Sequence, residues 1–363
     1  MNKDSRPFAS LAFLWPALAA ETASQFASTM AREFVNFAVG RDSATEIPEP
    51  QWTTRNKVAL ELTAVRLRDF SSGAQGTKTL VCAPFALHGA TIVDFAPDHS
   101  LVAALQAEGI DRIFVTDWRS ATADMRLWSI DDYLSSLNVL IDELGAPLDL
   151  IGLCQGGWMA LIYAARFPTK VRKLVLAGAP IDIAAGKSRV STLAANTPTT
   201  IFRELVNLGD GRMLGHHILK CWTPEFDREQ IQQLLEPQAE PGSASFDRLE
   251  CRFHDWYAWT VDLPGTYYLQ VVEQLFKENR LAAGNFVALG RRIDVSRLRC
   301  PVFLLAASED DTVAPEQVFA MERLVDVHTC AITKSTAPCG HLGLFMGRKV
   351  LGGVWRDIAR WLN

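Results

Sequence analysis

One segment near the middle of the chain constrains the possible folds more than any other: residues 149–160, DLIGLCQGGWMA. A short apolar run leads directly into GLCQG at residues 152–156, and a helix-like stretch follows. In a G-x-C-x-G arrangement the central residue sits on a sharp turn between a strand and a helix, so the residues two positions away must lack bulk. The segment therefore predicts a strand, a tight turn that presents Cys154, and a helix.

Short apolar runs alternate with helix-like stretches along most of the chain. The expected strands cover residues 58–69, 79–84, 113–116, 148–153, 171–177 and 300–307. The expected helices include residues 100–108, 131–144 and 352–362. Apolar strands that alternate with helices are typical of a parallel sheet covered on both faces. Together with the turn at Cys154, this alternation predicts an α/β-hydrolase fold: a mostly parallel sheet with helices on both faces.

Changes in composition divide the chain into four expected segments. Residues 40–52 are polar and contain prolines, which is typical of a linker. After Pro180 the alternation stops and the chain becomes rich in helix-forming and aromatic residues. The predicted segments are an N-terminal amphipathic helical arm and linker (1–47), the first part of the core (48–183), an inserted helical cap (184–285) and the second part of the core (286–363).

The N-terminal arm admits more than one interpretation. Residues 10–20 are almost wholly apolar and follow Lys3 and Arg6, so a cleaved signal peptide is one alternative. Trp15 and Pro16 interrupt the run, which is also too short to span a bilayer. We expect no transmembrane segment, a cytoplasmic location, and an amphipathic helix that packs on its own domain or lies on a partner or a hydrophobic granule surface.

Charge and cysteine content exclude several classes of function. The net charge of −5 provides no basic stripe of the kind that binds nucleic acid, so we expect no nucleic-acid partner. The seven cysteines are scattered, without the spacing of a zinc site. Most are expected to be small buried residues in a reducing cytosol. We expect neither a metal nor an organic cofactor.

A cysteine nucleophile needs a general base and a carboxylate that orients the base. In this fold they follow the nucleophile in the order acid, then histidine. Asp310 and Asp311 come directly after the last expected strand; Asp310 is preferred, and a solvated acidic loop is the alternative. His341 lies in a glycine-flanked loop before the last expected helix. The order predicts a catalytic triad of Cys154, Asp310 and His341.

Two backbone amides are expected to stabilise a developing oxyanion. The helix after Cys154 points its first amides at the sulfur, which favours the thiolate, and the N–H of Gln155 is the first expected donor. The second donor is expected in the loop after an early strand, from the N–H of Phe85, with that of Ala86 as an alternative. His88, nearby, is a candidate for a substrate contact or for a structural role.

At these residues the chain resembles the polyhydroxyalkanoate synthases, most closely the short class III catalytic subunit, over about residues 56–363. The matching motifs are Thr116-Asp117-Trp118, Asp131-Asp132-Tyr133, Gly152-Leu153-Cys154-Gln155-Gly156-Gly157, Cys300-Pro301-Val302 and Gly340-His341-Leu342-Gly343. In that family a cysteine in G-x-C-x-G-G carries the growing acyl chain, assisted by a histidine and an aspartate. The resemblance implies these roles for Cys154, His341 and Asp310.

A second resemblance points to the intracellular polyhydroxybutyrate depolymerases. It rests on Ala179-Pro180-Ile181-Asp182, Asp262-Leu263-Pro264-Gly265-Thr266-Tyr267-Tyr268-Leu269, Asp310-Asp311 and the segment from Gly340 to Arg348. Those enzymes also use a cysteine, but their nucleophile motif usually has proline where this chain has Gly156. Residues 119–121, in turn, lack a proline that synthases commonly carry. The direction of the reaction therefore stays open at the level of the sequence.

The expected activity is acyl transfer through a thioester on Cys154, synthase-like, with hydroxyacyl-CoA as the donor. The alternatives are a depolymerase, an esterase or thioesterase with the same triad, and a non-catalytic granule-associated protein that keeps the fold. The resemblance implies hydroxyacyl-CoA or polyester as the substrate. It also implies a polyester granule surface, a second synthase subunit or a second copy of the chain as partners.

Overall fold

The structure, a computed structural model, describes residues 47–222, 225–235 and 243–363. Residues from Glu46 to Asn363 form one compact unit. The predicted N-terminal arm, and with it the alternative of a signal peptide, lies outside the described residues apart from residue 47. In the part of the chain that the structure describes, no helix is both long and apolar enough to cross a bilayer.

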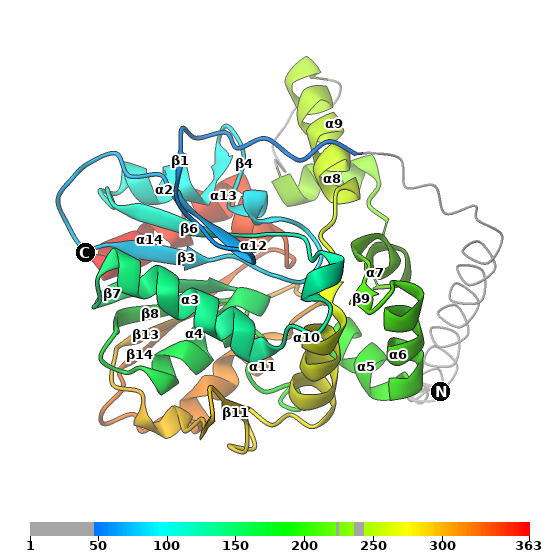
Figure 1. The fold of residues 1–363 in the computed structure, drawn as a ribbon. Coiled ribbons are helices and arrows are strands. Elements are labelled where there is room, and N and C mark those ends of the chain that lie inside the picture. Colours follow the sequence, from blue (N-terminus) through cyan, green and yellow to red (C-terminus); the bar gives the residue numbers. More distant parts are fainter. Residues whose placement is uncertain (1–46, 223–224, 236–242) are drawn as a thin grey trace, which may run out of the picture. The chain divides into compact units, whose positions relative to one another are not determined.

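A sheet of eight strands forms the centre of the unit, in the order β1-β2-β6-β3-β7-β8-β13-β14 (Figure 1). The strands are β1 (Lys57–Glu61), β2 (Val65–Asp69), β3 (Thr79–Cys82), β6 (Ile113–Trp118), β7 (Leu148–Leu153), β8 (Val171–Ala177), β13 (Val302–Ala307) and β14 (Ile332–Ala337). Pairs from β6 to β14 are parallel, whereas β1–β2 and β2–β6 are antiparallel. The predicted α/β fold with a mostly parallel sheet is confirmed.

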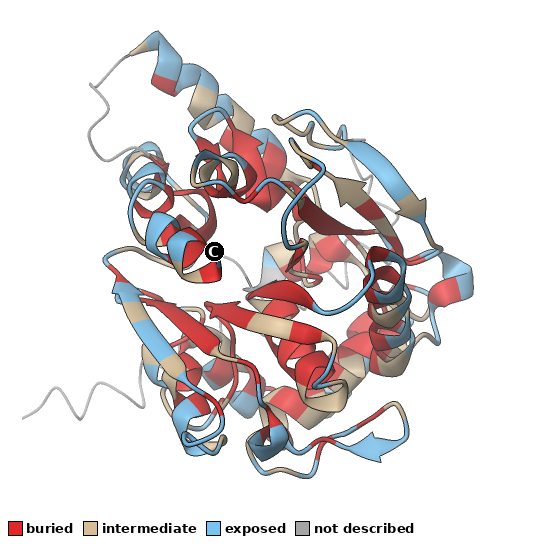
Figure 2. Cartoon of the chain, turned by 90° about the vertical axis from the view of Figure 1, so that its left-hand side faces the viewer, coloured by how far each residue is buried: buried red, intermediate tan, exposed pale blue. Residues whose placement is uncertain are grey.

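Helices cover both faces of this sheet (Figure 1). Helices α3 (Ile130–Leu144) and α4 (Gln155–Arg166) contact each other on one face, and α2 (Leu101–Ala107) contacts α14 (Val354–Leu362) on the other. Every residue of β3, β6, β7 and β13 is buried, because both faces of these strands are covered. Figure 2 shows the buried residues concentrated in the central strands and on the inner sides of the helices.

The last helix illustrates how the sequence pattern produces this packing. Trp355, Ile358 and Leu362 recur at helical spacing in α14, and all three are fully buried. They share one cluster with Ile151 and Leu153 of β7, which alternate with residues that face the other layer. Complete burial of one such aliphatic side chain stabilises the fold by about 1.5–3 kcal/mol.

Short elements connect these layers. They are η1 (Ala90–Val93), β4 (Asp94–Ala96), β5 (His99–Ser100), η2 (Ala123–Met125), β11 (Val287–Ala288), β12 (Arg291–Arg292), η4 (Val295–Arg297), α11 (Pro315–Phe319), η5 (Ala320–Arg323), α12 (Gly343–Met346) and α13 (Arg348–Leu351).

The chain between β8 and β11 is mainly helical. It forms α5 (Arg189–Asn196), α6 (Thr199–Leu208), β9 (Arg212–Met213), α7 (Gly215–Trp222), α8 (Arg228–Leu235), α9 (Ala244–Ala258), β10 (Leu263–Pro264), α10 (Gly265–Gln270) and the π-helix η3 (Val271–Lys277). Figure 1 shows α5 to α9 gathered at one end of the sheet, on the right of the view. The predicted cap, residues 184–285, covers these elements, and its boundaries stay a prediction.

Two parts of the sheet differ from the expectation. Residues 58–69 form two antiparallel strands, β1 and β2, rather than one strand. The alternation of apolar and polar residues continues through the turn, which contains neither glycine nor proline, so the pattern does not reveal it. β14 was not expected, because its sequence ITKSTA is mostly polar. It is an edge strand and is largely exposed, and such a strand needs few apolar residues.

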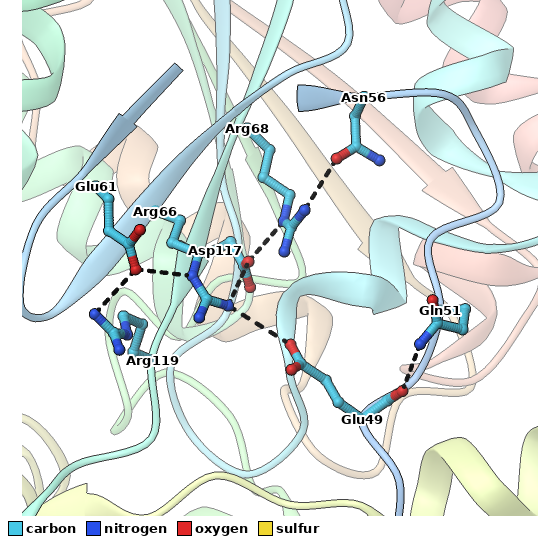
Figure 3. Close-up of polar contacts among 8 residues, drawn as sticks. All are labelled: Glu49, Gln51, Asn56, Glu61, Arg66, Arg68, Asp117 and Arg119. Atoms are coloured by element: carbon cyan, nitrogen blue, oxygen red, sulfur yellow. Dashed lines mark hydrogen bonds and ion pairs between the residues drawn. The ribbon is translucent and has the colours of Figure 1, made fainter. Parts of the chain in front are cut away.

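A buried carboxylate ties two of the strands together (Figure 3). Asp117, the penultimate residue of β6, accepts a hydrogen bond from Arg68 Nε of β2 at 2.6 Å, while Arg66 Nη1 lies 3.9 Å away. Arg68 also donates to the Asn56 side-chain oxygen at 3.0 Å. Burial raises the pKa of Asp117, and the Arg68 charge opposes that rise. Asp117 therefore depends on Arg68 to remain ionised inside the protein.

Replacing Arg68 by alanine will lower the free energy of unfolding by about 3 kcal/mol, because it leaves the buried Asp117 carboxylate without its partner. Denaturant unfolding measures the loss. Arg66→Ala is the matched control: Arg66 is more exposed and more distant, so its loss will cost less than about 1 kcal/mol. Equal losses in the two variants would contradict this account of the pair.

Candidate active site

Cys154 occupies the turn between β7 and α4, with backbone angles φ 48° and ψ −117°. A residue other than glycine adopts such a conformation at a cost of about 1–3 kcal/mol, and only where its surroundings enforce it. The Cys154 N–H donates to the Ala177 carbonyl at 2.9 Å, which ties the turn to the end of β8. The side chain is half-buried and lines a cavity.

Three glycines allow the backbone to pack closely around this turn. A Cβ atom at Gly156 would lie 2.2 Å from the Cys82 carbonyl oxygen, and one at Gly157 would lie 2.3 Å from the Ala179 Cβ. A Cβ atom at Gly152 would lie 2.6 Å from the Gly157 Cα. Approaches this short are repulsive, so a side chain at any of the three positions would displace its neighbours.

His341 and Asp310 meet at the same end of the sheet. The distance from His341 Nδ1 to Asp310 Oδ2 is 2.7 Å. The other carboxylate oxygen accepts hydrogen bonds from the backbone N–H groups of Thr312, at 2.9 Å, and Val313, at 2.8 Å. Because an ionised carboxylate only accepts, Nδ1 carries a proton and Nε2 is the ring nitrogen left for the Cys154 side chain.

The surroundings of His341 favour its protonated form. Burial alone would lower its pKa, but the charges of Asp310 and Cys154, and hydrogen bonding to both, raise the pKa well above its usual value. A histidine that is stabilised as imidazolium beside a thiol can hold the thiol proton. Protonation of the His341 ring is thus favoured by the two groups that its nitrogens face, Asp310 and Cys154.

The structure distinguishes between the two neighbouring aspartates. The Asp310 side chain has no exposed surface and contacts His341. Asp311 is exposed, and its carboxylate lies 3.8 Å from Arg189 Nε. Asp310 is thus the partner of His341, and the alternative of a solvated loop describes Asp311 but not Asp310.

The two expected oxyanion donors lie on separate segments that line the same cavity. Gln155 is the first residue of α4, so its backbone N–H has no partner within the helix. The Phe85 ring stacks on Tyr133, with 4.6 Å between centroids, and its carbonyl accepts a 3.4 Å hydrogen bond from the Tyr267 hydroxyl. The Phe85 carbonyl and the Ala86 N–H belong to one trans peptide group, in which the two bonds point in opposite directions. The hydrogen bond to the Phe85 carbonyl therefore orients the Ala86 N–H away from Tyr267. Phe85 and Ala86 both remain candidate donors.

A cavity of about 1120 Å³ opens beside Cys154 and His341. Its walls come from loops at the carboxyl ends of the strands and from the helical insertion, and they are mainly apolar. The apolar residues contributed by the insertion include Val190, Ile218, Phe226, Leu234, Tyr257 and Val272. The volume is slightly above the range of roughly 300–1,000 Å³ that is typical of small-molecule sites.

Sequence reasoning did not identify the aromatic residues of the insertion as part of the site. Tyr257, Tyr267 and Tyr268 are three of the many aromatic residues of the predicted cap, and the last two also belong to the segment that resembles depolymerases. All three line the cavity. Clustered aromatics equally predict a buried core, so the sequence carries no signal that separates the two roles.

The other thiols near the site differ from Cys154 in their surroundings. Burial raises the pKa of Cys82 and that of Cys339 to about 12, so both stay protonated at neutral pH. Among the residues that the structure describes, no three His, Cys, Asp or Glu side chains gather where they could hold a metal ion.

Comparison with known families identifies the group to which this arrangement belongs. Residues 62–352 match the family DUF3141, described as a protein of unknown function. The chain belongs to the DUF3141 family. The match extends from the turn between β1 and β2 to the residue after α13, so it includes Cys154, Asp310 and His341.

This DUF3141 protein is also similar to curated polymerase subunits. The protein named poly(3-hydroxyalkanoate) polymerase subunit PhaC from Synechocystis sp. is 28% identical over 290 residues, which are 75% of this chain and 74% of that protein. Its namesake from Allochromatium vinosum is 25% identical, over 75% of this chain and 77% of that protein. The predicted resemblance to polyhydroxyalkanoate synthases is confirmed at this level.

Solved structures similar to the DUF3141 protein share its fold. A monoacylglycerol lipase from Paleococcus ferrophilus has a TM-score of 0.53 at 17% identity, over 82% of this chain and 98% of that chain. A hydrolase from Pseudomonas aeruginosa PA01 has a TM-score of 0.51 at 15% identity, over 82% of this chain and 96% of that chain. At such low identity these similarities establish the α/β-hydrolase fold alone.

Replacing Asp310 by asparagine will lower the pKa of His341, because a neutral amide no longer stabilises the imidazolium. An NMR titration of the His341 ring in both proteins measures the shift. His88, whose pKa burial lowers to about 4, serves as a reference within the same spectra. A titration of His341 that is unchanged in the variant would contradict the assigned pairing.

The pairing of His341 with Asp310 predicts how the stability of the fold depends on pH. The pKa of His341 is higher in the folded than in the unfolded protein, so protonation of the ring stabilises the fold. This stabilisation is fully present below the unfolded-state pKa of about 6.5, and it is lost as the pH rises through the folded-state pKa. The difference in unfolding free energy between the wild type and Asp310→Asn will therefore shrink as the pH rises. Denaturant unfolding at a series of pH values measures it.

Proposed function

We propose that the chain is an acyltransferase that moves 3-hydroxyacyl groups through a thioester on Cys154, in the manner of a polyhydroxyalkanoate synthase. The observation that carries this proposal is the juxtaposition of Cys154 and His341 on the wall of a mainly apolar cavity, with the buried Asp310 bound to His341. The relatives named polymerase subunits support the substrate class. Hydroxyacyl-CoA is the proposed donor.

The first step forms the thioester. His341 holds the thiol proton, and the Cys154 sulfur attacks the thioester carbonyl of the donor, forming a new C–S bond. The bond to the CoA sulfur then breaks, and the imidazolium returns its proton to the departing thiolate. Asp310 keeps the ring oriented throughout, because its own position is held by two backbone amides.

The second step transfers the acyl group. The hydroxyl oxygen of another 3-hydroxyacyl unit attacks the carbonyl carbon of the thioester on Cys154, and the neutral His341 ring takes the hydroxyl proton. The C–S bond breaks, the sulfur leaves with the bonding pair, and an ester forms. Backbone N–H groups at Gln155 and in the Phe85–Ala86 loop are the proposed donors to the oxyanion that develops in both steps.

Hydrolysis of a polyester is the second candidate, and the charge of the cavity favours it. The charged residues that line the cavity among those described are five acids, Glu225, Asp227, Glu229, Glu309 and Asp311, and two bases, Arg189 and Lys349. The phosphates of CoA are repelled by such a lining, whereas a polyester is neutral. In this case water takes the place of the attacking hydroxyl.

The proposed partners follow from the same relatives. A second synthase subunit, a second copy of the chain and a polyester granule surface are all consistent with a polymerising enzyme. If the protein instead only coats granules, the described cysteine has no role there. Loss of function on changing Cys154 therefore separates the enzyme from a non-catalytic granule protein.

The decisive assay follows CoA release from (R)-3-hydroxybutyryl-CoA by the purified full chain, together with the appearance of insoluble polymer. Release with polymer establishes the synthase. Release without polymer indicates a thioesterase or a need for a second subunit. If no CoA is released, amorphous polyester granules become the substrate, and soluble 3-hydroxyacids released from them would establish the depolymerase.

Cys154→Ala will abolish acyl transfer, and Cys154→Ser will lose most of it. A serine hydroxyl ionises at far higher pH than a thiol, so it needs a stronger base than this site provides. The rate of CoA or hydroxyacid release measures both variants. Cys251→Ser, an exposed cysteine on α9, is the control and will leave the rate unchanged. Near-normal turnover by Cys154→Ser would contradict the cysteine mechanism.

Removing negative charge from the cavity will improve the use of CoA thioesters. In the double variant Asp227→Asn/Glu229→Gln, we expect kcat/KM for (R)-3-hydroxybutyryl-CoA to rise about threefold, with no change for the neutral p-nitrophenyl butyrate. Added salt will reduce the difference, because the acids are exposed and screened. The control Asp124→Asn/Glu143→Gln removes the same charge from the surface outside the cavity. Equal effects in the two double variants would contradict the role of the lining.

A further inference from the structure

His88 lies on the cavity wall shared with Cys154, three residues beyond Phe85. Its ring packs on Trp256 and Tyr257 of α9, with 4.4 and 4.9 Å between centroids. The mechanism above gives it no role. A polar ring placed in a mainly apolar wall needs hydrogen-bonding partners, and only one of its two nitrogens has one among the described residues.

The hydrogen bonding of His88 determines which nitrogen carries the proton. Nδ1 lies 3.3 Å from the Trp259 backbone carbonyl, which can only accept, so Nδ1 is the donor. Burial lowers the pKa of His88 to about 4, so the ring is neutral at physiological pH. In a neutral ring with a proton on Nδ1, Nε2 is an unprotonated acceptor.

We propose that His88 recognises the hydroxyl group of the substrate, its Nε2 accepting a hydrogen bond from the 3-hydroxyl of an acyl unit bound at Cys154. This inference rests on the proposed function. It adds to that function a residue, His88, that selects hydroxyacyl groups over simple acyl groups. A neutral acceptor is complementary to an O–H donor and unfavourable for a carboxylate or phosphate, which also only accepts.

The role of His88 is binding rather than proton transfer. A ring with a pKa near 4 is a weak base, so it does not compete with His341 for the hydroxyl proton. It orients the hydroxyl by accepting from it. A substrate without that hydroxyl leaves a lone pair on the cavity wall unsatisfied, which is the usual origin of strong discrimination against a deoxy analogue.

The first experiment compares kcat/KM for CoA release from (R)-3-hydroxybutyryl-CoA and from butyryl-CoA. We expect the wild type to prefer the hydroxyacyl donor by about tenfold, and His88→Phe to bring the ratio close to one. Phenylalanine keeps a ring against Trp256 and Tyr257 but lacks the nitrogen. The control is His254→Phe, which changes an exposed histidine of α9, the helix that carries Trp256 and Tyr257. This variant will keep the wild-type ratio.

The ratio separates recognition from a merely structural role. A parallel loss of turnover with both donors in His88→Phe would overturn the proposal, because it would show that His88 only supports its loop. An unchanged ratio would overturn it as well. If the wild type releases CoA from neither donor, the proposed synthase activity fails, and the inference about His88 is decided by binding alone.

The second experiment needs no turnover and keeps His88 in place. In Cys154→Ala protein labelled with ¹⁵N-histidine, long-range ¹H–¹⁵N spectra report the protonation of each ring nitrogen. We expect Nδ1 to be protonated and Nε2 not. Methyl (R)-3-hydroxybutyrate will shift the His88 Nε2 resonance, and methyl butyrate will not. A protonated Nε2 would overturn the proposal. So would an Nε2 resonance that shifts equally with both esters, or that shifts with neither.

Discussion

The close contact of three backbone segments around Cys154 is the constraint on which the site depends. Because Gly156 lies against the end of β3 and Gly157 against Ala179, helix α4 begins directly beside the carboxyl ends of β3 and β8. The turn has no room to relax, so Cys154 is held at φ 48°. That conformation projects the thiol beyond the sheet, toward the loops that carry His341 and Asp310.

Asp310 and His341 are held in place by several contacts, as Cys154 is held by its turn. Asp310 is fully buried as a side chain, and its charge is compensated by two backbone amides and the His341 ring. A buried charge with each oxygen occupied has a single arrangement, which is how a carboxylate orients a histidine. The three groups of the proposed triad therefore lie on segments of the sheet, whereas the insertion supplies much of the cavity around them.

The insertion also holds the loop after β3. The Val261 N–H donates to the Leu87 carbonyl at 2.8 Å, and a Cβ atom at Gly89 would lie 2.4 Å from the Trp259 ring. Tyr267 binds the Phe85 carbonyl in the same loop. One segment thus carries a candidate oxyanion donor and His88, and it is positioned by the helices that shape the cavity. A change in the insertion is expected to alter substrate preference and oxyanion stabilisation together.

The sequence by itself determined the features that depend on local pattern: the strand–turn–helix at Cys154, the parallel sheet, and the order of the cysteine, acid and histidine. Glycine spacing and alternating apolar runs are local properties, so they are legible without a structure. The sequence already favoured Asp310 over Asp311, but only the tertiary structure showed that Asp310 is buried against His341 and Asp311 is exposed. Only the tertiary structure divided residues 58–69 into two strands and placed Tyr267 and His88 on one cavity wall. Those outcomes depend on contacts between segments far apart in the chain, and a periodic pattern contains no information about them.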